Sequence, residues 1–125
     1  MEERPHYIYL LYSKVHINSS ERVYKIGKTR NFPARFNNYP KGSRLLGLWN
    51  CEDCNVAERR VLEVFREKFE ARRDAGLEYF QGDWKEMRNT IHTIICQLES
   101  DDDVKEQRSK VVLIDNKAFI LSIFE

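Results

Sequence analysis

The stretch of residues 22–44 restricts the fold of this chain more than any other part of its sequence. A β-rich run in it ends at Gly27, and Asn31 with Pro33 then predicts the start of a short helix, because proline is tolerated in the first helical turn. Pro40 predicts that this helix ends soon afterwards. A strand and a short helix must therefore follow one another closely here, which excludes a long helix.

The same stretch is strongly basic and aromatic. It contains seven Lys or Arg and no Asp or Glu, and four aromatic residues are interleaved with these cations: Tyr24, Phe32, Phe36 and Tyr39. Cations held among aromatic rings suit a polyanion that carries bases, which favours nucleic acid as the partner. The alternative is a solvated basic face beside core aromatics, and this stretch alone leaves it open.

Composition limits the class of protein. The chain has 125 residues, of which 42% are hydrophobic and 33% are charged, as expected for a soluble protein with a single core. No apolar run approaches the roughly 20 residues of a membrane-spanning helix, so we expect no membrane partner. Three cysteines cannot all pair with one another, and no signal peptide is evident. We therefore expect an intracellular protein of the nucleus or cytoplasm.

The distribution of charge divides the chain into two parts. Residues 1–98 carry 17 Lys and Arg against 13 Asp and Glu, a net charge of +4, whereas residues 99–125 carry 4 against 7, a net charge of −3. We expect the first part to be the folded domain and the second to be an acidic linker with a C-terminal β-hairpin. Two apolar runs on either side of a polar turn, residues 111–115 and 118–124, predict that hairpin.

The remaining pattern indicates an α+β fold. Runs of β-branched and aromatic residues predict three strands, at residues 6–12, 22–28 and 45–51. A polar loop at residues 13–21 would join the first two strands as a hairpin. Apolar residues at helical spacing predict two longer helices, at residues 55 to about 73 and 84–98. We expect a small three-stranded mixed or antiparallel sheet flanked by helices, with the C-terminal hairpin added.

Glu58 has an unusual place in the helix predicted to begin at Asn55. At about 100° per residue it falls in the middle of the apolar stripe, where burying an unpaired charge would be costly. Asn55 followed three residues later by Glu58 also fits a capping box, in which the carboxylate serves the start of the helix. The spacing leaves both interpretations open.

Three groups of residues follow one another along the chain: Tyr7-Ile8-Tyr9, then Lys25-Ile26-Gly27-Lys28-Thr29, then Arg35, Tyr39 and Glu58. Together they resemble the motifs of the GIY-YIG endonuclease family. The second group and the later Glu78-Tyr79-Phe80 resemble its phage and large-DNA-virus branch, which implies a virus-encoded protein acting in a host cell. The resemblance covers about residues 6–95. It departs from the family at Tyr7, in place of a glycine, and at Lys25, in place of a tyrosine.

The resemblance implies a GIY-YIG-like nuclease domain that hydrolyses phosphodiester bonds in DNA with the help of a metal. Its catalytic residues would be Tyr9, Lys25, Arg35, Tyr39 and Glu58. Glu58 would bind Mg²⁺ or Mn²⁺, hard cations that accept carboxylate oxygens. Tyr9 would take a proton from water, with Lys25 favouring its phenolate form. Arg35 would hold the scissile phosphate, and Tyr39 would orient the water or the phosphate.

Further contacts to DNA are expected from four basic residues, Lys28, Arg30, Lys41 and Arg44. Two other functions stay open: a relative that binds nucleic acid without cutting it, and an adaptor that acts through the C-terminal hairpin. A homodimer or a protein partner would then use residues 111–124.

The cysteines suggest a rival metal site. Cys51 and Cys54 have the spacing of zinc ligands, and His92 and Cys96 lie four residues apart on the polar side of the last predicted helix. Together these four residues would complete a tetrahedral zinc site, although two isolated pairs far apart in sequence are a common coincidence.

Overall fold

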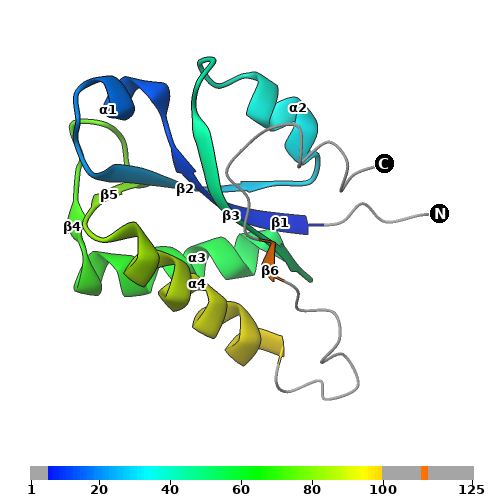
Figure 1. Cartoon of the computed structure of the whole chain (residues 1–125). Helices are drawn as coiled ribbons and strands as arrows, with labels where there is room; N and C mark the ends of the chain where they lie inside the picture. The colour runs from blue at the N-terminus through cyan, green and yellow to red at the C-terminus, as the bar shows by residue number, and fades with distance from the viewer. Residues whose placement is uncertain (1–5, 100–110, 113–125) are drawn as a thin grey trace.

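A six-stranded antiparallel sheet forms the centre of the protein, in the order β4-β5-β2-β1-β3-β6 (Figure 1). The computed structural model describes residues 6–99 and 111–112. The strands are β1 (His6–Tyr12), β2 (Val23–Thr29), β3 (Arg44–Cys51), β4 (Glu70–Ala71), β5 (Tyr79–Gln81) and β6 (Val111–Val112). The helices within these residues are α1 (Lys14–Asn18), α2 (Phe32–Asn37), α3 (Cys54–Lys68) and α4 (Trp84–Glu99).

The predicted α+β class is confirmed, and the three predicted strands are the central ones. β1 is paired along both edges, with Tyr9 opposite Gly27 of β2 on one side and opposite Leu48 of β3 on the other. Residues 8–11 of β1 are all buried, as a strand covered on both faces requires. The sheet is wider than the three strands expected, because the short strands β4, β5 and β6 extend it at its two edges.

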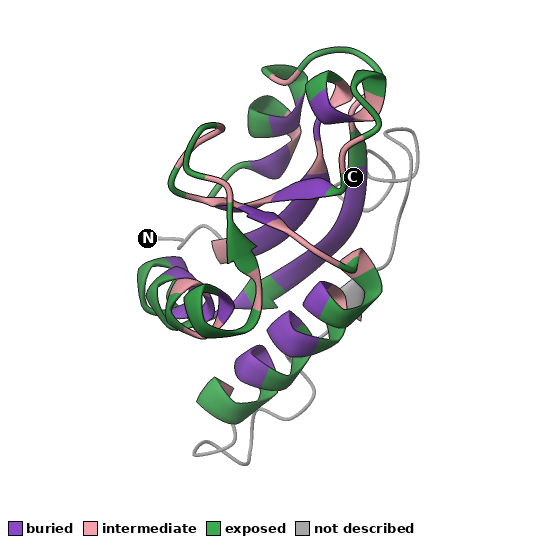
Figure 2. Ribbon diagram, turned by 90° about the vertical axis from the view of Figure 1, so that its left-hand side faces the viewer, coloured by how far each residue is buried: buried purple, intermediate pink, exposed green. Residues whose placement is uncertain are grey.

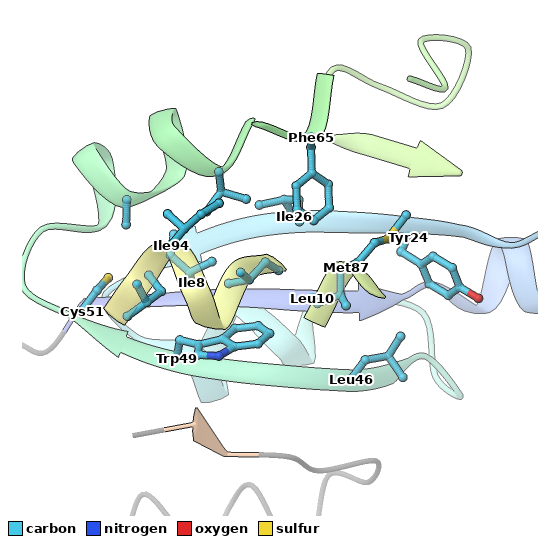
Figure 3. Close-up of a cluster of buried hydrophobic side chains, with 14 of the residues drawn as sticks. Ile8, Leu10, Tyr24, Ile26, Leu46, Trp49, Cys51, Phe65, Met87 and Ile94 are labelled. Atoms are coloured by element: carbon cyan, nitrogen blue, oxygen red, sulfur yellow. The ribbon is translucent and has the colours of Figure 1, made fainter. Parts of the chain in front are cut away.

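Helices α3 and α4 cover one face of the sheet and α2 lies on the other (Figure 1). Figure 3 shows the larger core, in which sheet residues Ile8, Leu10, Ile26 and Trp49 meet Phe65 of α3 and Met87 and Ile94 of α4. The smaller core under α2 consists of Tyr9, Leu11, Phe32, Phe36, Leu45 and Leu48. In Figure 2 the inward side of α4 is buried and its outward side is exposed, which follows from its apolar stripe.

Two helix boundaries differ from the sequence-based expectation. Residues 13–21, expected to be a loop, contain α1, whose N-cap Ser13 accepts a hydrogen bond from the backbone N–H of Val15. Helix α3 was expected to continue to about residue 73, but it ends at Lys68 because Phe69 is extended and Glu70–Ala71 pairs with β5.

The capping-box interpretation of Asn55 and Glu58 is wrong. Asp53 caps α3, and its Oδ1 accepts hydrogen bonds from the backbone N–H groups of Asn55 and Val56 at 2.9 and 3.4 Å. Glu58 therefore lies more than one turn inside the helix and has no role in capping its start. It is buried, with 8% of its surface exposed.

A cluster around Arg72 fixes the loop between β4 and β5. Its guanidinium donates to Glu21 (3.1 Å), to both carboxylate oxygens of Asp74 (2.9 and 2.8 Å) and to Gln81 (2.9 Å). Its backbone N–H donates to the carbonyl of Tyr79 at 2.9 Å. We call these contacts the Arg72 clasp; it ties the loop to the segment that leads into β2.

Of the predicted C-terminal hairpin, only Val111–Val112 falls within the described residues. It forms β6 and pairs with Leu48 and Trp49 of β3, so the first predicted arm joins the domain's own sheet. The second predicted arm, residues 118–124, lies outside the described residues. None of the helices in residues 6–99 combines the length and the apolar character needed to cross a membrane.

Candidate active site

A pair of tyrosines lies where α2 meets the centre of the sheet. The hydroxyl groups of Tyr9 in β1 and Tyr39, just beyond α2, are 2.6 Å apart and share a hydrogen bond. Tyr9 is 1% exposed, and its ring meets the edge of the Phe32 ring with the centroids 5.2 Å apart. Tyr39 is only partly buried. The pair therefore links the interior of the small core to the surface.

Gly27 makes room for the Tyr9 ring. Tyr9 and Gly27 are directly opposite in the β1–β2 pair, and a Cβ atom built on Gly27 would overlap the phenol end of Tyr9. A residue with any side chain here would push Tyr9 away from Tyr39. The glycine that ends the second motif is thus required by the position of the first motif's tyrosine.

Tyr9 is held in its neutral form. Burial, followed by the hydrogen bond to Tyr39, raises the pKa of Tyr9 far above its ordinary value, although the charge of Arg35 opposes the shift. Because Tyr9 keeps its proton, we infer that it donates the shared hydrogen bond and that Tyr39 accepts it. The hydroxyl proton of Tyr39 is then not used in this hydrogen bond, and Tyr39 is the member of the pair that lies nearer the surface.

Lys25 of β2 lies against Tyr39. Its Nζ is 5.1 Å from the centroid of the Tyr39 ring, 5.7 Å from that of Tyr79 and 3.8 Å from Glu78 Oε1. Burial lowers the pKa of Lys25, but Tyr39, Tyr79 and Glu78 together outweigh it and raise the pKa above its ordinary value. The resemblance placed this ammonium beside Tyr9; in the structure it lies against the ring of Tyr39, whose hydroxyl contacts that of Tyr9.

Glu58 approaches the same end of β2 from the opposite face. Its Oε1 lies 3.2 Å from Lys28 Nζ, and the same ammonium donates to Asn55 Oδ1 at 2.7 Å. Its Oε2 is fully buried and has no hydrogen-bond partner. Since buried polar atoms in proteins are nearly always hydrogen-bonded, this oxygen needs an explanation.

Glu78 brings a second carboxylate to Glu58. The residue directly precedes β5, and its carbonyl accepts a hydrogen bond from the backbone N–H of Ile26 at 2.9 Å. Burial, followed by the contact with Glu58, raises the pKa of Glu78. A buried carboxylate oxygen without a donor, next to a second carboxylate, fits a hard divalent cation that prefers oxygen ligands.

The predicted phosphate-binding residues surround α2. Arg35 is exposed on the last turn of α2, and Arg30, Lys41 and Arg44 are exposed in the segments that flank this helix. Lys28 is 40% exposed at its side chain while it contacts Glu58 and Asn55. The structure therefore brings together Tyr9, Tyr39 and Lys25, and separately Lys28 and Glu58, with Glu78 joining the two groups.

The four residues of the rival zinc site do not come together. Cys51 and Cys54 are buried where β3 leads into α3, whereas His92 and Cys96 lie on the exposed side of α4. Burial raises the pKa of Cys51 to about 12, which disfavours the thiolate that binds metal. Within residues 6–99 and 111–112 no group of three or more His, Cys, Asp or Glu is arranged to hold a metal ion.

A comparison with known protein families matches residues 6–95 to the T5orf172 domain. The chain belongs to the T5orf172 domain family. This phage-associated family is related to GIY-YIG and HNH-like nucleases, so a nuclease-like or nucleic-acid-binding role is compatible with membership. The matched region includes the tyrosine pair and both carboxylates of the T5orf172 domain. No curated protein and no solved structure gave a significant match.

Sequence reasoning missed two contacts in the site of this T5orf172 domain. It named Glu78 only as part of a motif of the resemblance, without a contact to Glu58, and it took Asn55 as a helix cap, although Asn55 holds the ammonium of Lys28. The signal for Asn55 was its distance of one helical turn from Glu58. No local signal could have placed Glu78, because its position depends on how β5 pairs with β2.

Proposed function

We propose that this T5orf172 domain is a metal-dependent DNA endonuclease of GIY-YIG type, which hydrolyses phosphodiester bonds. The observation that supports the proposal is the buried Glu58 oxygen without a hydrogen-bond donor, located at the same end of β2 as the hydrogen-bonded tyrosines. A site built only for stability would give that oxygen a donor.

The two tyrosines have different roles in general-base catalysis. Hydrolysis forms a bond between a water oxygen and phosphorus, breaks the bond to the leaving oxygen and releases a proton from the water. In this proposal Tyr39, as the phenolate, accepts that proton. Tyr9 is placed to donate to the Tyr39 oxygen over 2.6 Å, and the Lys25 ammonium lies 5.1 Å from the centroid of the Tyr39 ring. Tyr9 thus supports the base from the interior instead of acting as the base itself.

The basic residues bind and orient the substrate. Arg35 is exposed and close enough to influence Tyr9 electrostatically, so its planar guanidinium is suited to hold the scissile phosphate beside the pair. Arg30, Lys41 and Arg44 extend this charge along α2 and neutralise neighbouring phosphates. Glu58 would hold Mg²⁺ or Mn²⁺, which stabilises the negative charge that develops on the phosphate.

A cleavage assay tests the proposal. The full chain is incubated with supercoiled plasmid and with branched DNA in the presence of Mg²⁺, Mn²⁺ or EDTA. We expect cleavage with either metal and none with EDTA. DNA binding without cleavage on every substrate and metal would reject the nuclease and leave the non-cleaving binding module.

The assignment of Tyr39 has its own test in the rate of cleavage as a function of pH. Tyr39→Phe should abolish the rise of the rate with pH, because it removes the group that takes the proton. Tyr9→Phe should keep that rise at a reduced rate, because the base is still present without its donor. A rise that survives in Tyr39→Phe and disappears in Tyr9→Phe would return the role to Tyr9.

A further inference from the structure

The two carboxylates that lie near the end of β2, those of Glu58 and Glu78, contact each other. Glu58 comes from the first turns of α3, on the face of the large core, and Glu78 is the residue directly before β5. Each is accompanied by one lysine: Lys28 is 3.2 Å from Glu58, and Lys25 is 3.8 Å from Glu78. Two negative and two positive side chains therefore balance one another before any ligand is bound.

The lysines leave the space between the carboxylates without a donor. Lys28 contacts Oε1 of Glu58 and is also committed to Asn55, so it does not serve Oε2. Glu58 is 8% exposed, its Oε2 is buried, and the side chain of Glu78 contacts that of Glu58. A cluster of ion pairs that served stability alone would not leave one carboxylate oxygen fully buried and unpaired.

The backbone holds Glu78 in this place. The Glu78 carbonyl accepts the N–H of Ile26 at 2.9 Å, and the next residue, Tyr79, is paired with Lys25 across β2 and β5. The Glu78 side chain is 37% exposed, so it reaches from the buried oxygen of Glu58 to solvent.

We propose that Glu78 is a second ligand of the divalent cation that Glu58 holds, so that the metal site of this domain consists of two carboxylates from α3 and from the start of β5. The inference rests on the proposed function, since it concerns the same metal. Two carboxylates without a donor between them repel each other, and a doubly charged cation removes that repulsion while it satisfies the buried oxygen.

Binding of Mn²⁺ alone to the full chain, without DNA, tests the inference. Electron paramagnetic resonance measures the free ion, whose signal falls as Mn²⁺ binds. We expect Glu78→Gln to weaken Mn²⁺ binding about tenfold or more, as expected when one of two charged oxygen ligands is lost. Glu58→Gln should weaken it at least as much. Glu63→Gln, a change of equal charge on the exposed side of α3, should leave the affinity within about twofold of the unaltered chain.

Lys25→Met separates a ligand from a partner in an ion pair. If Glu78 binds the metal, removal of Lys25 frees its carboxylate and should leave the Mn²⁺ affinity unchanged or raise it by a few fold. If Glu78 serves only to balance Lys25, neither Glu78→Gln nor Lys25→Met should move the affinity. Circular dichroism of each variant checks that it is folded, and Glu78→Asp, which keeps the charge on a shorter side chain, should bind Mn²⁺ more tightly than Glu78→Gln.

The outcomes distinguish this inference from the proposed function. Unchanged Mn²⁺ affinity in Glu78→Gln, with affinity lost in Glu58→Gln, would reject Glu78 as a ligand and leave the nuclease proposal intact. Affinity lost in both variants, in a chain that cleaves no DNA, would support the two-carboxylate site and reject the nuclease. If the unaltered chain binds no Mn²⁺ at millimolar concentration, both the inference and the metal dependence are wrong.

Discussion

Helices α3 and α4 lie on the same face of the sheet, but the buried polar side chain of each helix is hydrogen-bonded to a different extent. In α4 the buried polar side chain is Thr90, whose hydroxyl donates to the Glu86 carbonyl at 2.8 Å and accepts from Lys68 at 3.2 Å. In α3 it is Glu58, which carries a charge and keeps one oxygen without a partner. The polar atom of α4 is satisfied within the fold, whereas that of α3 is available to a ligand. We therefore propose that α4 serves stability and that the start of α3 serves the site.

The largest effect should come from the start of α3. Glu58→Gln should lower DNA cleavage by about a thousandfold or more, because it removes the charge that would hold the metal. DNA binding measured without added metal should survive, since the basic residues that attract phosphate are unchanged. Gel-shift and cleavage assays on the same samples measure the two effects, with Glu63→Gln on the exposed side of α3 as the control. If Glu58→Gln cleaved DNA at the rate of the unaltered chain, the proposed role of α3 in the site would be wrong.

The next effect concerns the core side of α4. Ile91 is fully buried, so Ile91→Ala should lower the free energy of unfolding by about 2–5 kcal/mol through lost burial and a cavity. Chemical denaturation measures this loss. The cleavage rate at a temperature where the variant is still folded should stay close to that of the unaltered chain. A loss of cleavage as large as that of Glu58→Gln in a folded Ile91→Ala would show that α4 also positions the site.

A smaller effect should appear in the dependence of stability on pH. Burial and the contact with Glu58 raise the pKa of Glu78 above 4.5, so the unfolded chain loses this proton first as the pH rises. The stabilisation linked to Glu78 is therefore full below pH 4.5 and is lost as the pH rises through the raised value. Glu58→Gln removes one cause of the shift, so its stability relative to the unaltered chain should increase as the pH rises from below 4.5, by a small amount because the partly exposed Glu78 is screened by solvent. A difference that stays constant over this rise in pH would show that the two carboxylates do not interact.

The smallest effect should come from Thr90 in α4. Thr90→Val keeps the shape of the side chain and removes its two hydrogen bonds, so stability should fall by about 1 kcal/mol. Thr93→Val, at an exposed position of the same helix, is the control. Thermal unfolding measures both, and cleavage should be unchanged in both. If Thr90→Val changed the metal dependence of DNA cleavage, α4 would also contribute to the metal site.

The elements with a strong sequence period were predictable, and the contacts between distant elements were not. The buried face of Glu58 followed from the helical period of α3 alone. The end of α3 did not, because the pairing of Glu70–Ala71 with β5 overrides the helical preference of these residues. The approach of Glu78 to Glu58, and the position of Lys25 against Tyr39, both depend on the register of β5 and on the loop after α2, which no local pattern encodes. The functional residues were named by resemblance; their roles stay predictions.

The Arg72 clasp gives the two carboxylates unequal sensitivity to salt. Glu58 is fixed by a helix that packs through apolar side chains, which added salt does not loosen. Glu78 is carried by the segment between β4 and β5, which Arg72 holds through Glu21 and Asp74, side chains that are 41% and 68% exposed. Ion pairs this exposed are screened at high ionic strength. Glu78 is thus held by backbone pairing to β2 on one side and by ion pairs that salt weakens on the other, whereas Glu58 is held by apolar packing.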